Sequence, residues 1–169
     1  MAKRWVIKLG SGLLTRKDGK VDRVQIGKIA DQVAALIKGG HQVVIVSSGA
    51  IADEEIKVGD NDRLSAHVAA LVGADLLVIL SGIQGLMTKS DGTGDLIPSV
   101  RKIDDAVRAL AGGAGSERNV GGMVTKLLAA EIAAEGGVDT IIASGRREGV
   151  LLELAAGQKL GTRFSLKKK

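Results

Sequence analysis

Short runs of Val, Ile and Leu alternate along this chain with longer segments that have the apolar spacing of amphipathic helices. The first two runs, at residues 6–9 and 42–46, are separated by one helical segment that begins at a cap-like Asp22 and stops at Gly39. A strand, a helix and a strand in this order form a βαβ unit, in which the strands are parallel and the crossover is right-handed. The alternation continues along the chain and predicts an α/β fold, a three-layer αβα sandwich with a mostly parallel central sheet.

The remaining elements follow from the same periodicities. With 169 residues and no internal repeat or linker, the chain is expected to form a single domain spanning residues 1–169. Residues 10–20 are expected to form a loop. Further helices are predicted at about 62–72, 103–110, 123–134 and 148–155, further strands at 76–80, 140–143 and 160–164, and a small hairpin between 85–88 and 96–97.

Composition argues against several classes of function. The net charge is +5, part of it in a terminal run of three lysines, and Trp5 and Phe164 are the only aromatic residues. A nucleic-acid surface would need a basic stripe with stacking aromatics, so no nucleic-acid partner is expected. The absence of cysteine excludes disulfides and thiolate metal sites. Since no run has the length of a membrane span and the start shows no signal-peptide pattern, a cytoplasmic protein without a membrane partner is expected.

Two lysines stand where structure alone disfavours a cation. Lys8 ends the first strand-like run, and an ammonium beside a buried sheet loses hydration unless an anion compensates it. Lys126 falls in the first turn of a predicted helix, where the helix dipole already repels positive charge. A bound polyphosphate would relieve both conflicts, which indicates a phosphoryl-transfer site.

The common phosphate-binding fingerprints are absent. The chain has no Gly-x-x-x-x-Gly-Lys-Ser/Thr sequence, and Thr15 stands where a dinucleotide fingerprint beginning at Gly10 would need its third glycine. The amides of residues 10–12 could form an anion nest, although an ordinary strand-to-helix turn is the favoured explanation of this motif taken alone. Residues 121–126 combine glycine amides, a helix start and a lysine, and the alternative there is a loop followed by a surface lysine.

Further polar residues have both a structural and a functional explanation. Residues 60–62 (Asp-Asn-Asp) suit a helix cap, but one side chain is enough for that purpose. Ser47 and Ser48 end an apolar run and could satisfy backbone groups or contact a ligand. His41 and His67 have no evident catalytic or metal-binding partner and are interpreted as structural, so no protein-held metal is expected.

Taken together, these motifs resemble the amino acid kinase family, and within it the members that phosphorylate the side-chain carboxylate of glutamate in proline biosynthesis. The matching segments occur in the family's order through nearly the whole chain. They are residues 6–11, 44–52, 55–62, 64–66, 121–126 and 139–143.

The chain also departs from the family pattern. Between Ala52 and Glu55 it lacks a long segment that in the family helps to hold glutamate and supplies dimerisation helices, so self-association stays open. Ser81-Gly82 replaces a nucleotide-contacting Thr-Asp, Val120 replaces a threonine, and the RNA-binding-like domain that follows in many members has no counterpart. The resemblance therefore suggests a shortened kinase domain, either miniaturised or reconstructed.

The resemblance implies that the γ-phosphoryl group of ATP passes to glutamate, with Mg²⁺ accompanying the nucleotide. Lys8 and Lys126 would stabilise the transferred group, and Asp62 would hold both lysines. Amides of Gly10, Ser11 and Gly49 would bind phosphate oxygens. The residues implied to bind ATP are Lys8, Gly10, Ser11, Ser81, Gly82, Val120, Gly121, Gly122, Met123, Val124, Thr125 and Lys126, and those implied to bind the amino acid are Ser48, Gly49, Ala50, Asp60 and Asn61.

Two other functions stay open from sequence: a non-catalytic nucleotide-binding or structural domain, and a kinase for a different small acid. If catalysis is retained, Lys8→Ala is expected to reduce turnover more than folding stability, on the view that Lys8 is an unpaired buried cation.

Overall fold

A single six-stranded sheet forms the centre of the protein in the computed structural model, which describes residues 3–47, 61–112 and 122–166. The strand order is β2-β1-β3-β5-β6-β4. Strands β1, β2, β3 and β5 are mutually parallel, β6 runs antiparallel to β5, and β4 runs parallel to β6. Their bounds are β1 Arg4–Leu9, β2 Gln42–Ser47, β3 Leu76–Ser81, β4 Ser99–Val100, β5 Asp139–Ser144 and β6 Thr162–Phe164.

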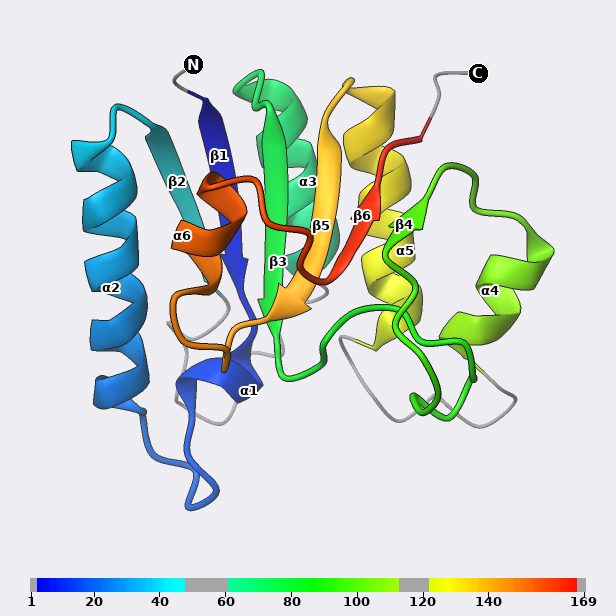
Figure 1. Cartoon of the computed structure of the whole chain (residues 1–169), viewed down its shortest axis with the longest axis horizontal. Coiled ribbons are helices and arrows are strands. Elements are labelled where there is room, and N and C mark those ends of the chain that lie inside the picture. Colours follow the sequence, from blue (N-terminus) through cyan, green and yellow to red (C-terminus); the bar gives the residue numbers. More distant parts are fainter. Residues whose placement is uncertain (1–2, 48–60, 113–121, 167–169) are drawn as a thin grey trace.

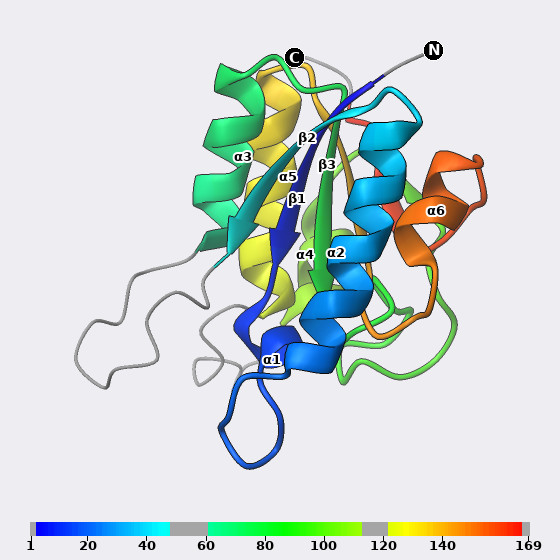
Figure 2. The same ribbon diagram turned by 90° about the vertical axis from the view of Figure 1, so that its left-hand side faces the viewer.

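Helices cover both faces of the sheet, as the two views in Figures 1 and 2 show. On one face lie α1 (Ser11–Leu14), α2 (Arg23–Lys38) and α6 (Val150–Ala155). On the other lie α3 (Asn61–Leu71) and α5 (Met123–Glu135), with α4 (Asp105–Ala111) packed against α5. The predicted three-layer αβα sandwich with a mostly parallel sheet is confirmed.

The alternation of side chains along β1 assigns neighbouring residues to different layers. Trp5, Ile7 and Leu9 pack in the core beneath α2 and α6, whereas Val6 packs beneath α3 and α5. Lys8 shares the side of Val6 because side chains two positions apart in a strand lie on the same face. It is thereby directed towards the layer that contains α3 and α5.

The first helical segment begins and ends where its residues predict. The side chain of Asp22 accepts a hydrogen bond of 3.0 Å from the amide of Gln25, which is the expected N-cap. At the other end Gly40 has a φ of +86°, and the amide of His41 donates to the carbonyl of Leu36. A left-handed residue at this place turns the chain directly into β2.

Small residues allow α3 and α5 to approach closely. Their contact surface is built from the fully buried alanines Ala66, Ala69, Ala129, Ala130 and Ala133. Because these side chains take little space, the first turns of both helices lie side by side at the carboxyl edge of the parallel strands (Figure 2).

The structure contains the predicted hairpin in short form but differs from the prediction at the loop. The predicted hairpin is present as a single antiparallel bridge between Met87 and Leu96, with backbone bonds from the Ile97 amide to the Leu86 carbonyl and from the Thr88 amide to the Asp95 carbonyl. The expected loop at 10–20 contains the short helix α1, and the two-residue strand β4 had no sequence signal. Within the described ranges, no helix combines the length and apolar character needed to cross a membrane.

The core predicts a sharp difference between two leucines. Leu77 on β3 is 0% exposed, whereas Leu71 at the end of α3 is 87% exposed. We expect Leu77→Ala to lower the free energy of unfolding by about 2–5 kcal/mol through the cavity it leaves. The matched Leu71→Ala change should stay within about 0.5 kcal/mol of the parent. Urea denaturation followed by circular dichroism measures both, and equal losses would contradict this assignment of the core.

Candidate active site

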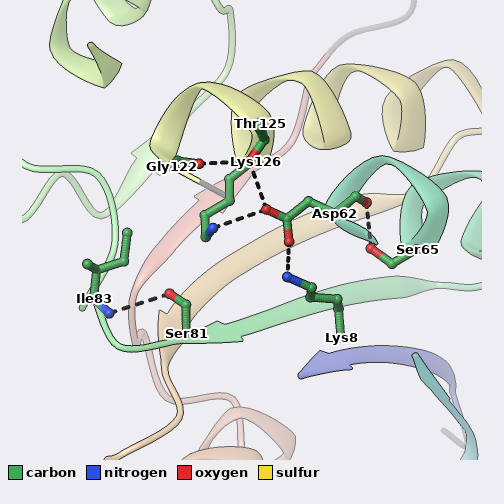
Figure 3. Close-up of polar contacts among 8 residues, drawn as sticks. All are labelled: Lys8, Asp62, Ser65, Ser81, Ile83, Gly122, Thr125 and Lys126. Carbon is green, nitrogen blue, oxygen red and sulfur yellow. Dashed lines mark hydrogen bonds and ion pairs between the residues drawn. The ribbon is translucent and has the colours of Figure 1, made fainter. Parts of the chain in front are cut away.

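Three charged side chains from three different elements meet beneath the carboxyl edge of the sheet (Figure 3). The Nζ of Lys8 pairs with Oδ1 of Asp62, and the Nζ of Lys126 lies 3.0 Å from Oδ2 of the same carboxylate. Lys8, Asp62 and Lys126 are 5%, 0% and 3% exposed, respectively. We call these three residues the Lys-Asp-Lys cluster.

Each member reaches the cluster because of its position in its element. Lys8 is the second-to-last residue of β1, Asp62 is the second residue of α3, and Lys126 lies in the first turn of α5. The hydroxyl of Ser65 donates a 2.6 Å hydrogen bond to the backbone carbonyl of Asp62, which fixes the first turn of α3. A carboxylate at a helix start is favoured by the dipole, so the fold itself supports Asp62 at this place.

Thr125 connects the cluster to the beginning of α5. Its hydroxyl oxygen is 2.9 Å from Oδ2 of Asp62 and 2.8 Å from the carbonyl of Gly122, and its one proton can be donated to either acceptor (Figure 3). Lys126 and Thr125 thus approach the same carboxylate oxygen from adjacent positions. This contact of Thr125 was not predictable from local sequence, because Asp62 lies 63 residues away in the chain.

The electrostatics of the cluster centre on Asp62. Burial alone would raise the pKa of its carboxyl, but the charges of Lys126 and Lys8, and the hydrogen bonds that both donate, outweigh that effect and hold the pKa below the ordinary value of 3.8. Asp62 is therefore a carboxylate at neutral pH. With two ammonium groups and one carboxylate, the cluster carries a net charge of +1.

The pairing of Lys8 corrects one expectation. Lys8 is not an unpaired cation, since it forms an ion pair with the fully buried Asp62. Part of the desolvation conflict read from the sequence is relieved within the protein. Because one carboxylate stands against two ammonium groups, the remaining charge still favours an anion at this place.

The turn after β1 forms hydrogen bonds within the protein. The amide of Gly10 donates a 3.0 Å hydrogen bond to the carbonyl of Leu80 on β3, so this amide is already engaged and the expectation that it binds phosphate is not supported. Ser11 begins α1 at the carboxyl end of β1. Ser81 ends β3 beside this turn, and its hydroxyl accepts from the amide of Ile83 at 3.4 Å (Figure 3). Gly82 is exposed in the bend that follows.

The other candidate residues fall into two groups. Gly122 precedes α5 and offers its carbonyl to Thr125, Met123 packs partly against the core, Val124 is 45% exposed, and Asn61 begins α3. The rest lie outside the described residues: Ser48, Gly49, Ala50, Asp60, Val120 and Gly121. The structure thus brings together the residues expected to stabilise phosphoryl charge, whereas most of those expected to hold the amino acid are not described.

The site consists of two buried lysines at the carboxyl edge of a parallel sheet, joined by a carboxylate from a helix start. Sequence comparison identifies a family that agrees with this arrangement. The chain belongs to the amino acid kinase family, whose sequence pattern matches residues 3–59 and 50–144. Among its relatives are glutamate 5-kinases: the one from Vibrio vulnificus is 44% identical over 161 residues, and the one from Citrobacter koseri is 47% identical over 161 residues.

These alignments cover the chain and its relatives unequally. Each includes 94% of this chain, but only 42% of the Vibrio vulnificus protein and 44% of the Citrobacter koseri protein. The chain therefore spans less than half the length of these relatives.

Solved structures show the same fold at much lower sequence identity. UMP kinase from Bacillus anthracis superposes with a TM-score of 0.69 at 15% identity, covering 96% of both chains. Carbamate kinase from Giardia lamblia bound to AMP-PNP gives a TM-score of 0.69 at 15% identity and 99% coverage of both chains. At this identity the likeness establishes the fold.

The depressed pKa of Asp62 predicts how stability depends on pH. The folded chain binds the Asp62 proton less tightly than the unfolded chain, so the carboxylate stabilises the fold at neutral pH. This contribution is lost as the pH falls below 3.8 towards the lower folded pKa. Asp62→Asn should lower the free energy of unfolding at pH 7 by about 3–5 kcal/mol, because two ammonium groups remain buried without their carboxylate. It should also flatten the pH dependence below 3.8.

Urea titrations at a series of pH values measure both effects. Asp91→Asn is the matched control, since the pKa of Asp91 is lowered by hydrogen bonds from Thr93 but Asp91 lies in an exposed turn. It should leave stability at pH 7 nearly unchanged. A flat response of the parent protein below pH 3.8 would contradict the proposed charge state of Asp62.

Proposed function

We propose that this chain transfers the γ-phosphoryl group of ATP to the side-chain carboxylate of L-glutamate. The observation that carries the proposal is the Lys-Asp-Lys cluster: two buried ammonium groups share one carboxylate at the carboxyl edge of a parallel sheet. In open α/β sheets this edge is where ligands bind. The identity of 44–47% to glutamate 5-kinases supports the choice of acceptor.

In this reaction the protein forms no covalent bond with either substrate. A carboxylate oxygen of glutamate attacks the γ-phosphorus, and the bond from that phosphorus to the oxygen bridging the β-phosphorus breaks. The products are an acyl phosphate and ADP. Since the attacking carboxylate is already ionised, no general base is required, and Asp62 is unsuited to that role because its pKa is lowered and two lysines contact it.

The residues of the cluster then have distinct roles. Lys8 and Lys126 neutralise charge on the transferred phosphoryl oxygens, which is the largest contribution expected in phosphoryl transfer. Asp62 keeps the two ammonium groups apart at a fixed spacing, and Thr125 orients its Oδ2. Amides at the beginning of α5, after Gly122, and the amide of Ser11 complete the donor set for phosphate oxygens.

Magnesium fits this site as a companion of the nucleotide. The described part of the chain brings no group of three or more His, Cys, Asp or Glu side chains together as metal ligands. The buried carboxylate of the site is already paired with both lysines. Phosphate oxygens would therefore hold most of the Mg²⁺ coordination shell, and bound Mg²⁺ supplies charge neutralisation between the phosphates.

A second candidate function is nucleotide binding without phosphoryl transfer. The chain spans less than half the length of its glutamate 5-kinase relatives. A domain that retains the phosphate-binding edge but lacks acceptor contacts would bind nucleotide without turnover. Ser48, Gly49, Ala50 and Asp60, on which the acceptor contacts would depend, lie outside the described residues.

Calorimetric titration with Mg-ATP, followed by L-glutamate in the same cell and an ADP assay, separates these functions. We expect saturable ATP binding and ADP release that depends on glutamate. L-glutamine is the matched control, since its neutral amide cannot be the nucleophile and should release no ADP. ATP binding without ADP release, whichever acceptor is added, would identify a nucleotide-binding domain. ADP release with another small acid but not glutamate would identify a kinase of different specificity, and no binding would contradict both proposals.

The charge balance of the cluster predicts a separation between stability and activity. Lys126→Met leaves Asp62 paired with Lys8, a neutral pair, so it should destabilise the fold less than Asp62→Asn does. It should nevertheless lower kcat by about a hundred- to a thousandfold, as loss of one preorganised charge contact does. Steady-state ADP release and urea denaturation measure the two effects.

Lys28→Met is the control for a lysine outside the site, because its side chain is 55% exposed on α2. It should leave kcat unchanged within about twofold. A Lys126→Met protein with full activity, or a Lys28→Met protein with the same loss, would exclude the cluster from catalysis.

A further inference from the structure

The outer edge of β2 has no neighbouring strand among the described residues. β2 lies at one end of the sheet and is hydrogen-bonded to β1 alone. It is six residues long, with the sequence Gln-Val-Val-Ile-Val-Ser, and contains no charge and no proline. Charges, prolines, bulges or a very short strand usually protect the edge of a natural sheet. The opposite end has such protection, since β4 has only two residues, whereas β2 resembles a strand that pairs with another.

Two residues of β2 direct their backbone groups away from the sheet. The amide of Gln42 donates a 3.0 Å hydrogen bond to the carbonyl of Lys3, so Gln42 faces β1. Successive residues of a strand turn their N–H and C=O groups to opposite sides, which directs those of Val43 and Ile45 outward. Within the described ranges no residue bonds to these four groups. They present the donor and acceptor pattern that a further strand requires.

Apolar side chains extend this edge onto the helices that flank it, α2 and α3 (Figure 2). Ile45 shares the face of Val43, which packs on the core beneath α2, and Ile45 is 49% exposed. Ile26 and Ile37 of α2 are 39% and 55% exposed, and Leu64 of α3 is 50% exposed. The helical spacing of the sequence assigns these three residues to the buried side of their helices, yet the folded chain does not cover them.

The two isoleucines of α2 lie on the side of that helix away from α6. They are about three turns apart and therefore share one side of α2. Gln32, whose Oε1 accepts a 2.9 Å hydrogen bond from the amide of Leu151 in α6, lies about a third of a turn from them. Because α6 packs on the inner side of α2 and β2 ends the sheet, Ile26 and Ile37 border the β2 edge (Figure 1).

A second copy of β2 matches this edge by symmetry. With a twofold axis at Val44, Val43 of each copy lies opposite Ile45 of the other, and each of these pairs exchanges two backbone hydrogen bonds. The side chains of Ile45 and Val43 then pack together on the face of α2, as cross-strand neighbours do. Another protein would have to supply an uncharged apolar strand of the same pattern, which a second copy of this chain already has.

We propose that two copies of this chain associate through β2, antiparallel across a twofold axis, so that their two sheets become one continuous sheet. The pairing satisfies the outward backbone groups of Val43 and Ile45 in both copies. It also covers Ile26, Ile37 and Leu64. Because the symmetric contact uses the β2 edge of each copy, the assembly closes at a dimer. The contact lies beside the sheet, so the carboxyl edge with the Lys-Asp-Lys cluster stays open to ligands.

Sedimentation velocity from micromolar to millimolar protein tests the association. We expect the mass to rise from one chain to two and no further. Ile45→Lys places two ammonium groups on the same face of the paired strands and should raise the Kd of the dimer at least about tenfold. Leu152→Lys is the matched control, since Leu152 is 42% exposed on α6, away from β2, and this change should leave the Kd unaltered. Circular dichroism checks that both variants are folded.

Hydrogen exchange of the parent protein locates the contact without any substitution. The amides of Val43 and Ile45 should exchange at least about tenfold more slowly above the Kd than below it, because they become bonded only in the dimer. The amide of Val44 faces β1 and should be protected at both concentrations. A single chain at every concentration, assembly beyond two chains, unchanged exchange at Val43 and Ile45 in a dimer, or an equal effect of Leu152→Lys would overturn the proposal.

Discussion

One carboxylate shared by two ammonium groups is the interaction on which the rest of this structure depends. Asp62 is fully buried. Without partners, burial would raise the pKa of its carboxyl until the group became protonated and neutral. Lys8 and Lys126 prevent this, and each of them in turn is tolerable beneath the sheet because Asp62 is present. The three groups fix β1, α3 and α5 relative to one another, yet they leave one positive charge. Because of this surplus positive charge, the same three residues that stabilise the fold also favour the binding of an anion.

The packing of small residues makes this arrangement possible. If Ala66, Ala69, Ala129 and Ala133 were large, α3 and α5 would stand farther apart, and Lys126 would not reach the carboxylate of Asp62. At the carboxyl end of α5, the close approach continues at Gly136, where a Cβ atom would lie 2.5 Å from the Cβ of Ala70. The helix pair is therefore closely packed along its length. The geometry of the charged site follows from apolar packing on the same two helices.

Much of this architecture was predictable because its signals are local. The helix cap at Asp22, the stop at Gly39 and Gly40, and the apolar strand runs are each encoded within a few residues, and the structure confirms them. The site was predictable in part, since Lys8 and Lys126 conflict with their local surroundings. What could not be predicted from local pattern were the relations between distant residues, namely the Thr125 hydroxyl at Asp62 and the Gly10 amide that donates to Leu80. The resemblance to a family implied the Asp62 contacts, which periodicity alone did not.

The two faces of β1 explain how one strand contributes both to the apolar core and to the charged site. Its alternation directs Lys8 towards α3 and α5, while Trp5 enters the layer of α2 and α6 at the other end. A strand at the middle of a sheet, hydrogen-bonded to β2 and β3 on either side, holds both side chains in fixed positions. Because β1 is paired along nearly its whole length with both neighbouring strands, a displacement of Lys8 is resisted on both sides, and the sheet holds its ammonium group in place against Asp62.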